Sequence, residues 1–169
     1  MTAAPLAAIA CSHTINDGAN IIQWHLVGMF APSFFTGALI KRFGLSPILF
    51  AGMALNVVCV IAAMSSVSLP AFYLALLCLG IGWNFLFVGG TTLLAQSCRP
   101  NERAKTQGVA ELMRYVATAA ATLAAGPFLL SEGWARVNVA ILPVLVLAAC
   151  MTLWWMLAER QRALAAAIS

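Results

Sequence analysis

A short basic turn separates two long uncharged stretches of this chain. Lys41 and Arg42 lie between residues 19–40 and residues 45–67, and neither stretch contains Asp, Glu, Lys or Arg. Each stretch is long enough, at about 1.5 Å per residue, to cross a hydrocarbon core roughly 30 Å thick. Because two adjacent cations are costly in lipid, the turn that holds them must reach water. The sequence therefore predicts a chain that crosses a membrane back and forth through tight hairpins.

The composition excludes a soluble globular domain. Of the 169 residues, 63% are hydrophobic and 8% are charged, whereas about a quarter are charged in a soluble domain. The basic residues lie between apolar stretches rather than on one helix face, so we expect no nucleic-acid partner. The five cysteines lack the spacing of metal ligands, and the sequence contains no nucleophile–base pair or phosphate-binding loop. We therefore expect no enzyme activity, no metal and no cofactor.

Five complete membrane helices are predicted, because a helix satisfies its own backbone groups in lipid and barrel strands would alternate in polarity. The predicted spans are residues 19–40, 45–67, 69–97, 107–130 and 137–158. The preceding residues 1–12 are apolar but cover only about half a membrane crossing. We interpret them as a partial helix of a chain truncated within it, or alternatively as a short re-entrant piece.

The distribution of basic residues predicts the orientation of these spans, because cytoplasmic connections carry an excess of Lys and Arg. Seven of the nine basic residues fall on one side of the predicted membrane: Lys41, Arg42, Arg99, Arg103, Lys105, Arg160 and Arg162. We therefore expect their connections and the tail, residues 159–169, to be cytoplasmic. The connections near Ser66 and Glu132 are expected to face outward.

The basic turn also carries a recognisable pattern, Gly-Ala-Leu-Ile-Lys-Arg-Phe-Gly. It resembles the signature cytoplasmic loop of the major facilitator superfamily, Gly-x-x-x-Asp-Arg-x-Gly-Arg-Arg. Gly37, Arg42 and Gly44 match this pattern, while Lys41 stands where an acidic residue is usual. The resemblance implies that the two glycines permit close helix approach and a tight turn.

Two further stretches support the resemblance, and together they cover essentially the whole chain. Residues 79–84 are similar to the glycine-rich tenth helix of the family, and residues 99–108 to the loop that follows it. The resemblance implies an all-α integral membrane bundle over residues 1–158, from within the seventh helix to the twelfth, in the cell inner membrane. It also implies an N-terminal six-helix half outside this chain, in cis or in trans.

The function implied is transport of a small solute, driven by a proton gradient or by the solute's own gradient. Because such transporters bind substrate between two halves, we expect this half alone to be inactive. The alternative is a membrane module that does not transport, or one subunit of a split transporter, which packs on a partner membrane protein.

Polar side chains within the predicted spans are the candidate substrate contacts, because such groups are costly in lipid and usually face a cavity or another helix. Asn84 lies near the middle of its span, beside Trp83. Its amide could orient a substrate against the Trp83 ring, or form an interhelical hydrogen bond that supports packing. The other cavity candidates are Asn20, Gln23, His25 and Asn56, of which the first three could instead cap the span at the water interface.

Glu111 and Arg114 are three residues apart near the cytoplasmic edge of their predicted span, and share a helix face with Gln107. They could form an interfacial ion pair that helps to close a cytoplasmic gate. Alternatively, Glu111 could be a proton-coupling carboxylate with Arg114 as its counter-ion or as an anchor for an anionic substrate. Pro32 and Pro127 each lie within a span and predict helix kinks suited to a rocking motion.

Overall fold

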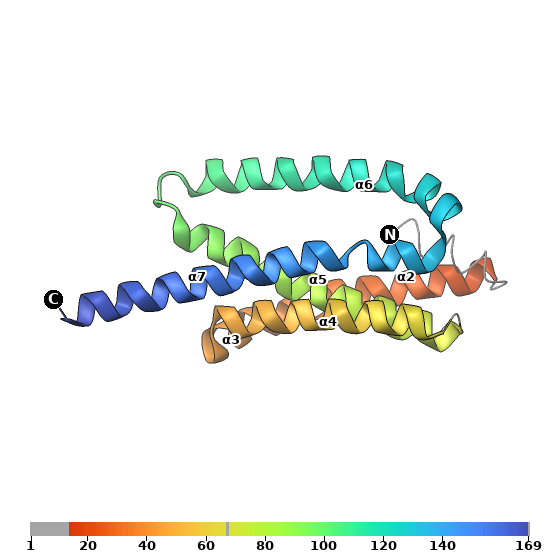
Figure 1. Ribbon diagram of the computed structural model, residues 1–169, viewed down its shortest axis with the longest axis horizontal. Coiled ribbons are helices and arrows are strands. Elements are labelled where there is room, and N and C mark those ends of the chain that lie inside the picture. The colour runs from red at the N-terminus through yellow and green to blue at the C-terminus, as the bar shows by residue number, and fades with distance from the viewer. Residues whose placement is uncertain (1–13, 67, 169) are drawn as a thin grey trace.

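The computed structural model describes residues 14–66 and 68–168, and every regular element in these ranges is an α-helix. This confirms the all-α part of the predicted fold. The helices run side by side along the long axis of the molecule (Figure 1). They are α2 (Ile15–Phe30), α3 (Ser33–Phe43), α4 (Leu45–Ser65), α5 (Leu69–Ser97), α6 (Arg103–Val139) and α7 (Leu142–Ile168). The partial helix predicted for residues 1–12 lies outside the described residues.

The predicted span 19–40 is two helices rather than one. The first helix, α2, begins four residues earlier than predicted, because Thr14 and Asp17 form a capping box that satisfies amide groups at its start. It ends at Phe30, and α3 begins at Ser33. Pro32 lies between them and has no amide hydrogen with which to continue the helical ladder. The kink expected at this proline is therefore a break between two helices.

Gly44 turns the chain from α3 directly into α4. Its φ angle is 92°, a value that side chains with a Cβ rarely adopt and glycine adopts freely. Lys41 and Arg42 occupy the last turn of α3, where cations are favoured by the negative end of the helix dipole. The close helix approach expected at Gly37 is not observed. A Cβ placed there would have no atom of another described helix within 4 Å.

The boundary between the last two predicted spans also differs from the structure. The α6 helix continues to Val139 and has its non-helical dihedral angles at Gly133 (φ 77°, ψ 171°), rather than at Pro127. The final helix, α7, begins at Leu142 instead of residue 137, and it continues through the predicted tail to Ile168. Proline suits the first turn of a helix, where its missing amide has no helical partner, and Pro143 occupies that place in α7.

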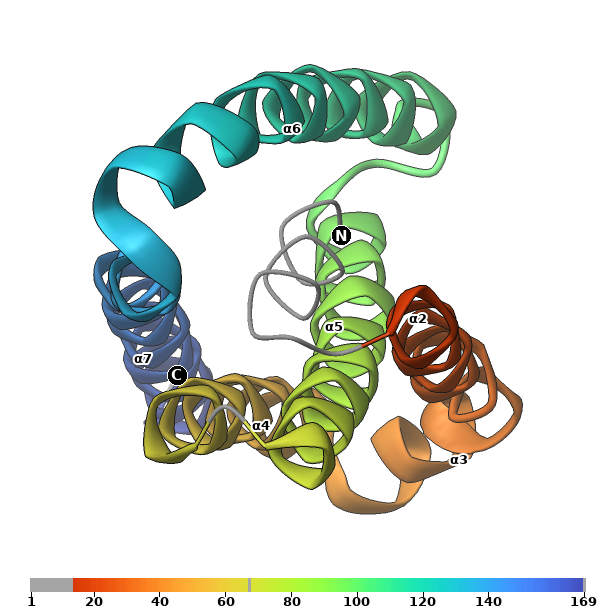
Figure 2. The same cartoon turned by 90° about the vertical axis from the view of Figure 1, so that its right-hand side faces the viewer.

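The α5 helix is the centre of the packing, with α2 on one side and α4 on another (Figure 2). Glycines let the backbones approach closely. A Cβ placed at Gly80 would lie 2.5 Å from the His25 carbonyl oxygen of α2, and one at Gly82 would lie 2.9 Å from the Gly52 carbonyl oxygen of α4. These three helices also supply the buried apolar core, which includes Ile21, Cys59, Phe72, Ala75 and Leu76.

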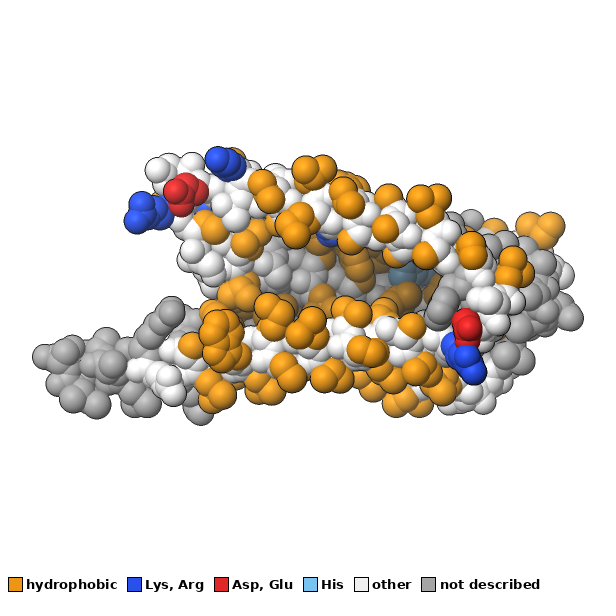
Figure 3. All heavy atoms as spheres, turned by 45° about the horizontal axis from the view of Figure 1, so that its top comes forward, with side chains coloured by type: hydrophobic (Ala, Val, Ile, Leu, Met, Phe, Trp, Pro, Cys, Tyr) orange, Lys and Arg blue, Asp and Glu red, His pale blue; other side chains and the backbone are white. Residues whose placement is uncertain are grey.

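The outer surface is apolar between charged ends. Figure 3 shows hydrophobic side chains along the outer faces of α6 and α7, with acidic and basic groups gathered near the two ends of α6. Large apolar side chains such as Leu112, Leu123 and Leu147 are exposed there, an arrangement that water does not favour and lipid does. Within the described residues, α4 and α5 are long and apolar enough to cross a membrane.

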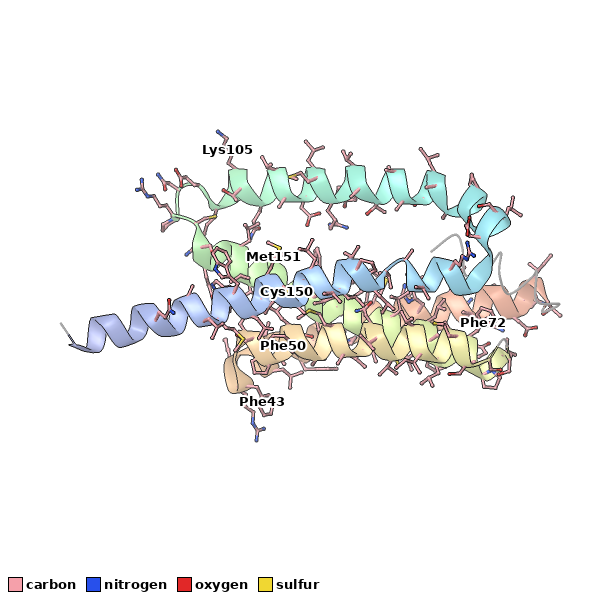
Figure 4. The ribbon with its side chains drawn as sticks, viewed as in Figure 1. Phe43, Phe50, Phe72, Lys105, Cys150 and Met151 are labelled. Carbon is pink, nitrogen blue, oxygen red and sulfur yellow. The ribbon has the colours of Figure 1, made fainter. Side chains whose placement is uncertain are left out.

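The basic connections lie together at one end of the bundle. The α3–α4 turn and the α5–α6 connection lie at the same end, where Phe43 and Lys105 are labelled in Figure 4, whereas Phe72 lies towards the other end. The α4–α5 connection and the bend near the end of α6 lie at that other end (Figure 1). The fold therefore places the basic α3–α4 turn and the basic α5–α6 connection at the same end of the bundle.

Replacement of Gly80 by Ala should destabilise the bundle, because the added methyl group would meet the His25 carbonyl and force α2 away from α5. Overpacking of this kind costs about 1–3 kcal/mol. The matched control is Gly108→Ala on α6, where nothing lies within 4 Å of the added atom. Thermal unfolding in detergent should show a lower midpoint for Gly80→Ala than for the control. Equal midpoints would contradict the close α2–α5 contact.

Candidate functional site

Trp83 and Asn84 are neighbours in sequence but serve different faces of α5. Successive residues on an α-helix are about 100° apart around its axis. Asn84 is 1% exposed and lies against α2 and α3, whereas Trp83 is half-buried and faces α6 across a groove. Trp83 and Asn84 were expected to line one cavity. Instead, Asn84 is packed between helices, and Trp83 lines an open groove.

Asn84 joins α5 to both sides of the break at Pro32. Its Nδ2 atom donates hydrogen bonds to the Met29 carbonyl oxygen at 2.7 Å and to the Ser33 hydroxyl at 2.6 Å. The Thr36 hydroxyl lies 2.7 Å from the Asn84 Oδ1 atom and 2.7 Å from the Pro32 carbonyl oxygen, so it can donate to either. The amide thus has partners on the last turn of α2 and the first turn of α3.

The bond to Met29 satisfies a backbone carbonyl that loses its helical partner at the break. In a continuous helix the Ser33 amide would bond to the Met29 carbonyl. Among the described residues around this break, the backbone amides donate instead to the carbonyl oxygens of Val27, Ala31 and Pro32. The Asn84 amide takes the place of the missing donor on Met29. The geometry therefore favours the packing interpretation of Asn84 over the substrate-cavity interpretation.

His25 and Asn56 also belong to helix packing. His25 is buried, and its Nδ1 atom lies 2.7 Å from the Leu76 carbonyl oxygen of α5; since a carbonyl only accepts, Nδ1 carries the proton. Asn56 donates from Nδ2 to the Gly52 carbonyl oxygen of its own helix at 2.8 Å. The same Nδ2 atom would lie 2.6 Å from a Cβ at Gly82, so Asn56 packs against α5.

Asn20 and Gln23 are exposed on α2 and line neither of the two grooves described next. The structure thus brings Trp83, Glu111 and Arg114 together and separates the other candidates from them.

Two adjoining grooves lie between α5 and α6. The first, which we call the ring groove, has a volume of about 330 Å³ and is lined chiefly by Trp83, Phe87, Gly90, Leu94, Glu111 and Arg114. The second, which we call the polar groove, has a volume of about 480 Å³ and is lined chiefly by Thr91, Thr92, Gln96, Arg103, Gln107 and Glu111. Phe87, Thr91 and Glu111 border both grooves, so the two form one continuous depression.

Aromatic rings form one wall of the ring groove. Trp83 and Phe87 are one helical turn apart on α5 and stack with ring centroids 4.8 Å apart and planes only 7° from parallel. The Arg114 guanidinium of α6 lies 5.3 Å from the centroid of Phe87 and 4.4 Å from that of Tyr115. Contacts between a guanidinium and a ring at these distances are attractive, so Arg114 connects α6 to the aromatic wall on α5.

Glu111 and Arg114 form an ion pair within α6. The Arg114 Nε atom donates to Glu111 Oε2 at 3.1 Å, and its Nη2 atom also contacts that oxygen. Both side chains are about one-third exposed, at 36% and 35%. Both partners belong to one helix, so the ion pair does not itself join two of the described helices. The cation–ring contact of Arg114 with Phe87 reaches α5, and a role in a cytoplasmic gate stays a prediction.

Sequence reasoning did not identify Phe87 or Gly90 as part of this site. Phe87 could have been found from its spacing of four residues from Trp83, which places both rings on one helix face. Gly90 carries no such signal, since α5 also contains Gly80, Gly82 and Gly89. Only the structure separates the glycines that touch another helix from the one that borders open space.

Comparison with known proteins agrees with the predicted family. A model described as Major Facilitator Superfamily matches residues 2–167. The chain is 42% identical over 147 residues to the riboflavin transporter RfnT of Brucella anthropi, an alignment that covers 87% of this chain and 37% of that protein. No solved structure matches the chain.

Two uncharacterized MFS-type transporters of Bacillus subtilis are also similar. YddS is 32% identical over 157 residues, covering 86% of this chain and 36% of its own length. YdeG is 34% identical over 115 residues, covering 67% of this chain and 27% of its own length. The chain thus spans about a third of the length of the curated relatives that it matches.

A double-mutant cycle between Asn84 and Thr36 should detect the bond between α5 and α3. Each of Asn84→Ala and Thr36→Val should lower the free energy of unfolding, and the double variant should lose less than their sum. The expected coupling is about 1 kcal/mol, as for other hydrogen bonds between membrane helices. Asn20→Ala, at an exposed position on α2, is the control. Full additivity of Asn84→Ala and Thr36→Val would contradict the network.

Proposed function

The chain belongs to the major facilitator superfamily, and we propose that it forms most of the C-terminal half of a secondary transporter for a small organic solute. The match of the family model to residues 2–167 carries this proposal. The apolar outer surface and the two long apolar helices support its place in a lipid bilayer. The proposed mechanism is alternating access, in which two helical halves rock about a site between them.

In the proposed arrangement the chain contributes five complete membrane spans. The first consists of α2 and α3 together, and the others are α4, α5, the part of α6 before Gly133, and α7. We place the end that holds Lys41, Arg42 and the α5–α6 connection in the cytoplasm of the inner membrane, because positive charge accumulates on that side. The C-terminus then also lies in the cytoplasm. The gathering of the basic connections at one end supports this orientation.

We propose that the substrate is riboflavin or a closely similar flat heterocycle. The support is the 42% identity with a protein named as a riboflavin transporter. A stacked aromatic pair in the ring groove adds to it, since flat rings bind well against aromatic side chains. The neutral Glu111–Arg114 ion pair suits a polar but uncharged ligand better than it suits an anion, because Glu111 would repel an anion.

The proposed transporter requires a second, N-terminal six-helix half, in cis or in trans. Transporters of this architecture bind substrate near the bilayer midplane between their two repeats. One half therefore offers a single wall of the transport path and cannot close it alternately from both sides. We propose that this chain does not transport by itself.

Riboflavin flux into proteoliposomes should distinguish this proposal from a non-transporting module. Vesicles that contain this chain joined to its N-terminal half should take up radiolabelled riboflavin with saturation. Vesicles that contain only this chain should show no more uptake than empty vesicles, since no closed path exists. Saturable flux through the chain alone, or its absence in the joined protein, would contradict the proposed function.

A further inference from the structure

We propose that the depression between α5 and α6 binds the solute in two parts: the flat ring system stacks in the ring groove, and a hydroxyl-bearing side chain lies in the polar groove. The inference rests on the proposed function and names the site and the ligand chemistry for it. A ligand of this kind combines a fused aromatic ring with a flexible polyol, as riboflavin does. The combined depression has the size of a small-molecule site.

The stacking surface for the ring is already formed. The Trp83 and Phe87 rings are nearly parallel, with centroids 4.8 Å apart, and they hold each other in place on one face of α5. Both side chains are only partly buried, so aromatic surface remains open to the groove. A rigid stacking surface binds a flat ring with little loss of side-chain freedom, because the rings are ordered before the ligand arrives.

Gly90 provides the room in which a ring can lie. Three other glycines of α5 meet another helix: a Cβ at Gly80, Gly82 or Gly89 would lie 2.5–2.7 Å from atoms of α2 or α4. A Cβ at Gly90 would meet nothing within 4 Å, and Gly90 borders the ring groove. Helix packing therefore does not explain this glycine. Its effect is to keep open the space beside Trp83 and Phe87.

The ion pair at the edge of the ring groove matches the polar edge of such a ring. The pyrimidine edge of a flavin alternates carbonyl oxygens with a ring N–H group. The Arg114 guanidinium can donate to a carbonyl, and the Glu111 carboxylate can accept from the N–H group. Because the two charges cancel locally, a neutral ring can satisfy both partners without leaving a buried net charge.

The polar groove continues from the same residues and suits a polyol. It presents the hydroxyl groups of Thr91 and Thr92 and the amides of Gln96 and Gln107. The two threonine hydroxyls donate to the Phe87 and Val88 carbonyl oxygens of their own helix, so they can accept hydrogen bonds from a ligand. The glutamine amides can both donate and accept, and together these groups can pair with the hydroxyls of a sugar alcohol. Since Phe87, Thr91 and Glu111 border both grooves, a ring and its attached chain can occupy them together.

Two pairs of matched substitutions test this assignment in the complete transporter. Trp83→Ala removes the stacking surface, and its control is Trp24→Ala, at a tryptophan of α2 that is 55% exposed and lies away from the α5–α6 grooves. Gly90→Leu fills the ring groove, and its control is Gly108→Leu, where no atom lies within 4 Å of the added Cβ. The measurement is the KM for riboflavin uptake, which does not depend on the amount of protein made.

We expect Trp83→Ala and Gly90→Leu each to raise the KM by roughly tenfold, as the loss of a stacked ring does at other sites, and the controls to stay within about twofold of the parent. Trp83→Phe should restore most of the affinity because it keeps a ring. Lumichrome, which has the ring without the polyol, should compete with riboflavin in the parent and roughly tenfold less well in Trp83→Ala.

The outcomes separate the two proposals. If the parent transports riboflavin and its KM is unchanged in Trp83→Ala and Gly90→Leu, the two-part site is wrong while the proposed function stands. If the parent transports no riboflavin, the proposed substrate is wrong, and the two-part site, which rests on it, is wrong as well. An equal rise in KM for Trp24→Ala or Gly108→Leu would also overturn the site, because the effect would then be general.

Discussion

In a bilayer, a backbone carbonyl that loses its helical partner must find another within the protein, and this chain meets that demand at Pro32. The proline divides one predicted membrane span into α2 and α3, and the Met29 carbonyl is left without the Ser33 amide. The Asn84 side chain of α5 supplies the missing donor and also bonds to Ser33. Irregular backbone is tolerated at membrane depth where such a partner buries it, so the break between α2 and α3 depends on α5.

Because α2 and α3 depend on α5, one side of α5 is packed against other helices and another side borders open grooves. On the side towards α2 and α4, Gly80, Gly82 and Gly89 allow backbone contact, and His25 is anchored to the Leu76 carbonyl. The side towards α6 has no such contacts at Gly90, and there the helix borders two grooves. One helix is thus fixed tightly enough on two sides to hold an aromatic surface in place on its third. In the proposed transporter, this arrangement presents a rigid wall to the solute.

The sequence predicted the all-helical architecture, the basic connections at one end of the bundle and the family, because uncharged stretches and clustered cations are local features of the chain. The division of Trp83 from Asn84 could not be predicted in the same way. Almost every residue of α5 is apolar or small, so hydrophobic periodicity does not show which face meets a neighbouring helix. Asn84 left two interpretations open for this reason, and Gly90 could not be told from Gly80. Those distinctions depend on where α2, α4 and α6 lie.

Water-soluble maleimide labelling tests the central claim, that one face of α5 is packed and another lines the solute path. The complete transporter would carry Gly90→Cys and keep the buried Cys78 of the α5 core, with Cys59 replaced by Ala and Cys11, Cys98 and Cys150 replaced by Ser. The account predicts that the cysteine at position 90 is labelled, that riboflavin slows this labelling, and that Cys78 stays unlabelled. Labelling of Cys78 but not of position 90, or labelling at position 90 that riboflavin does not change, would contradict it.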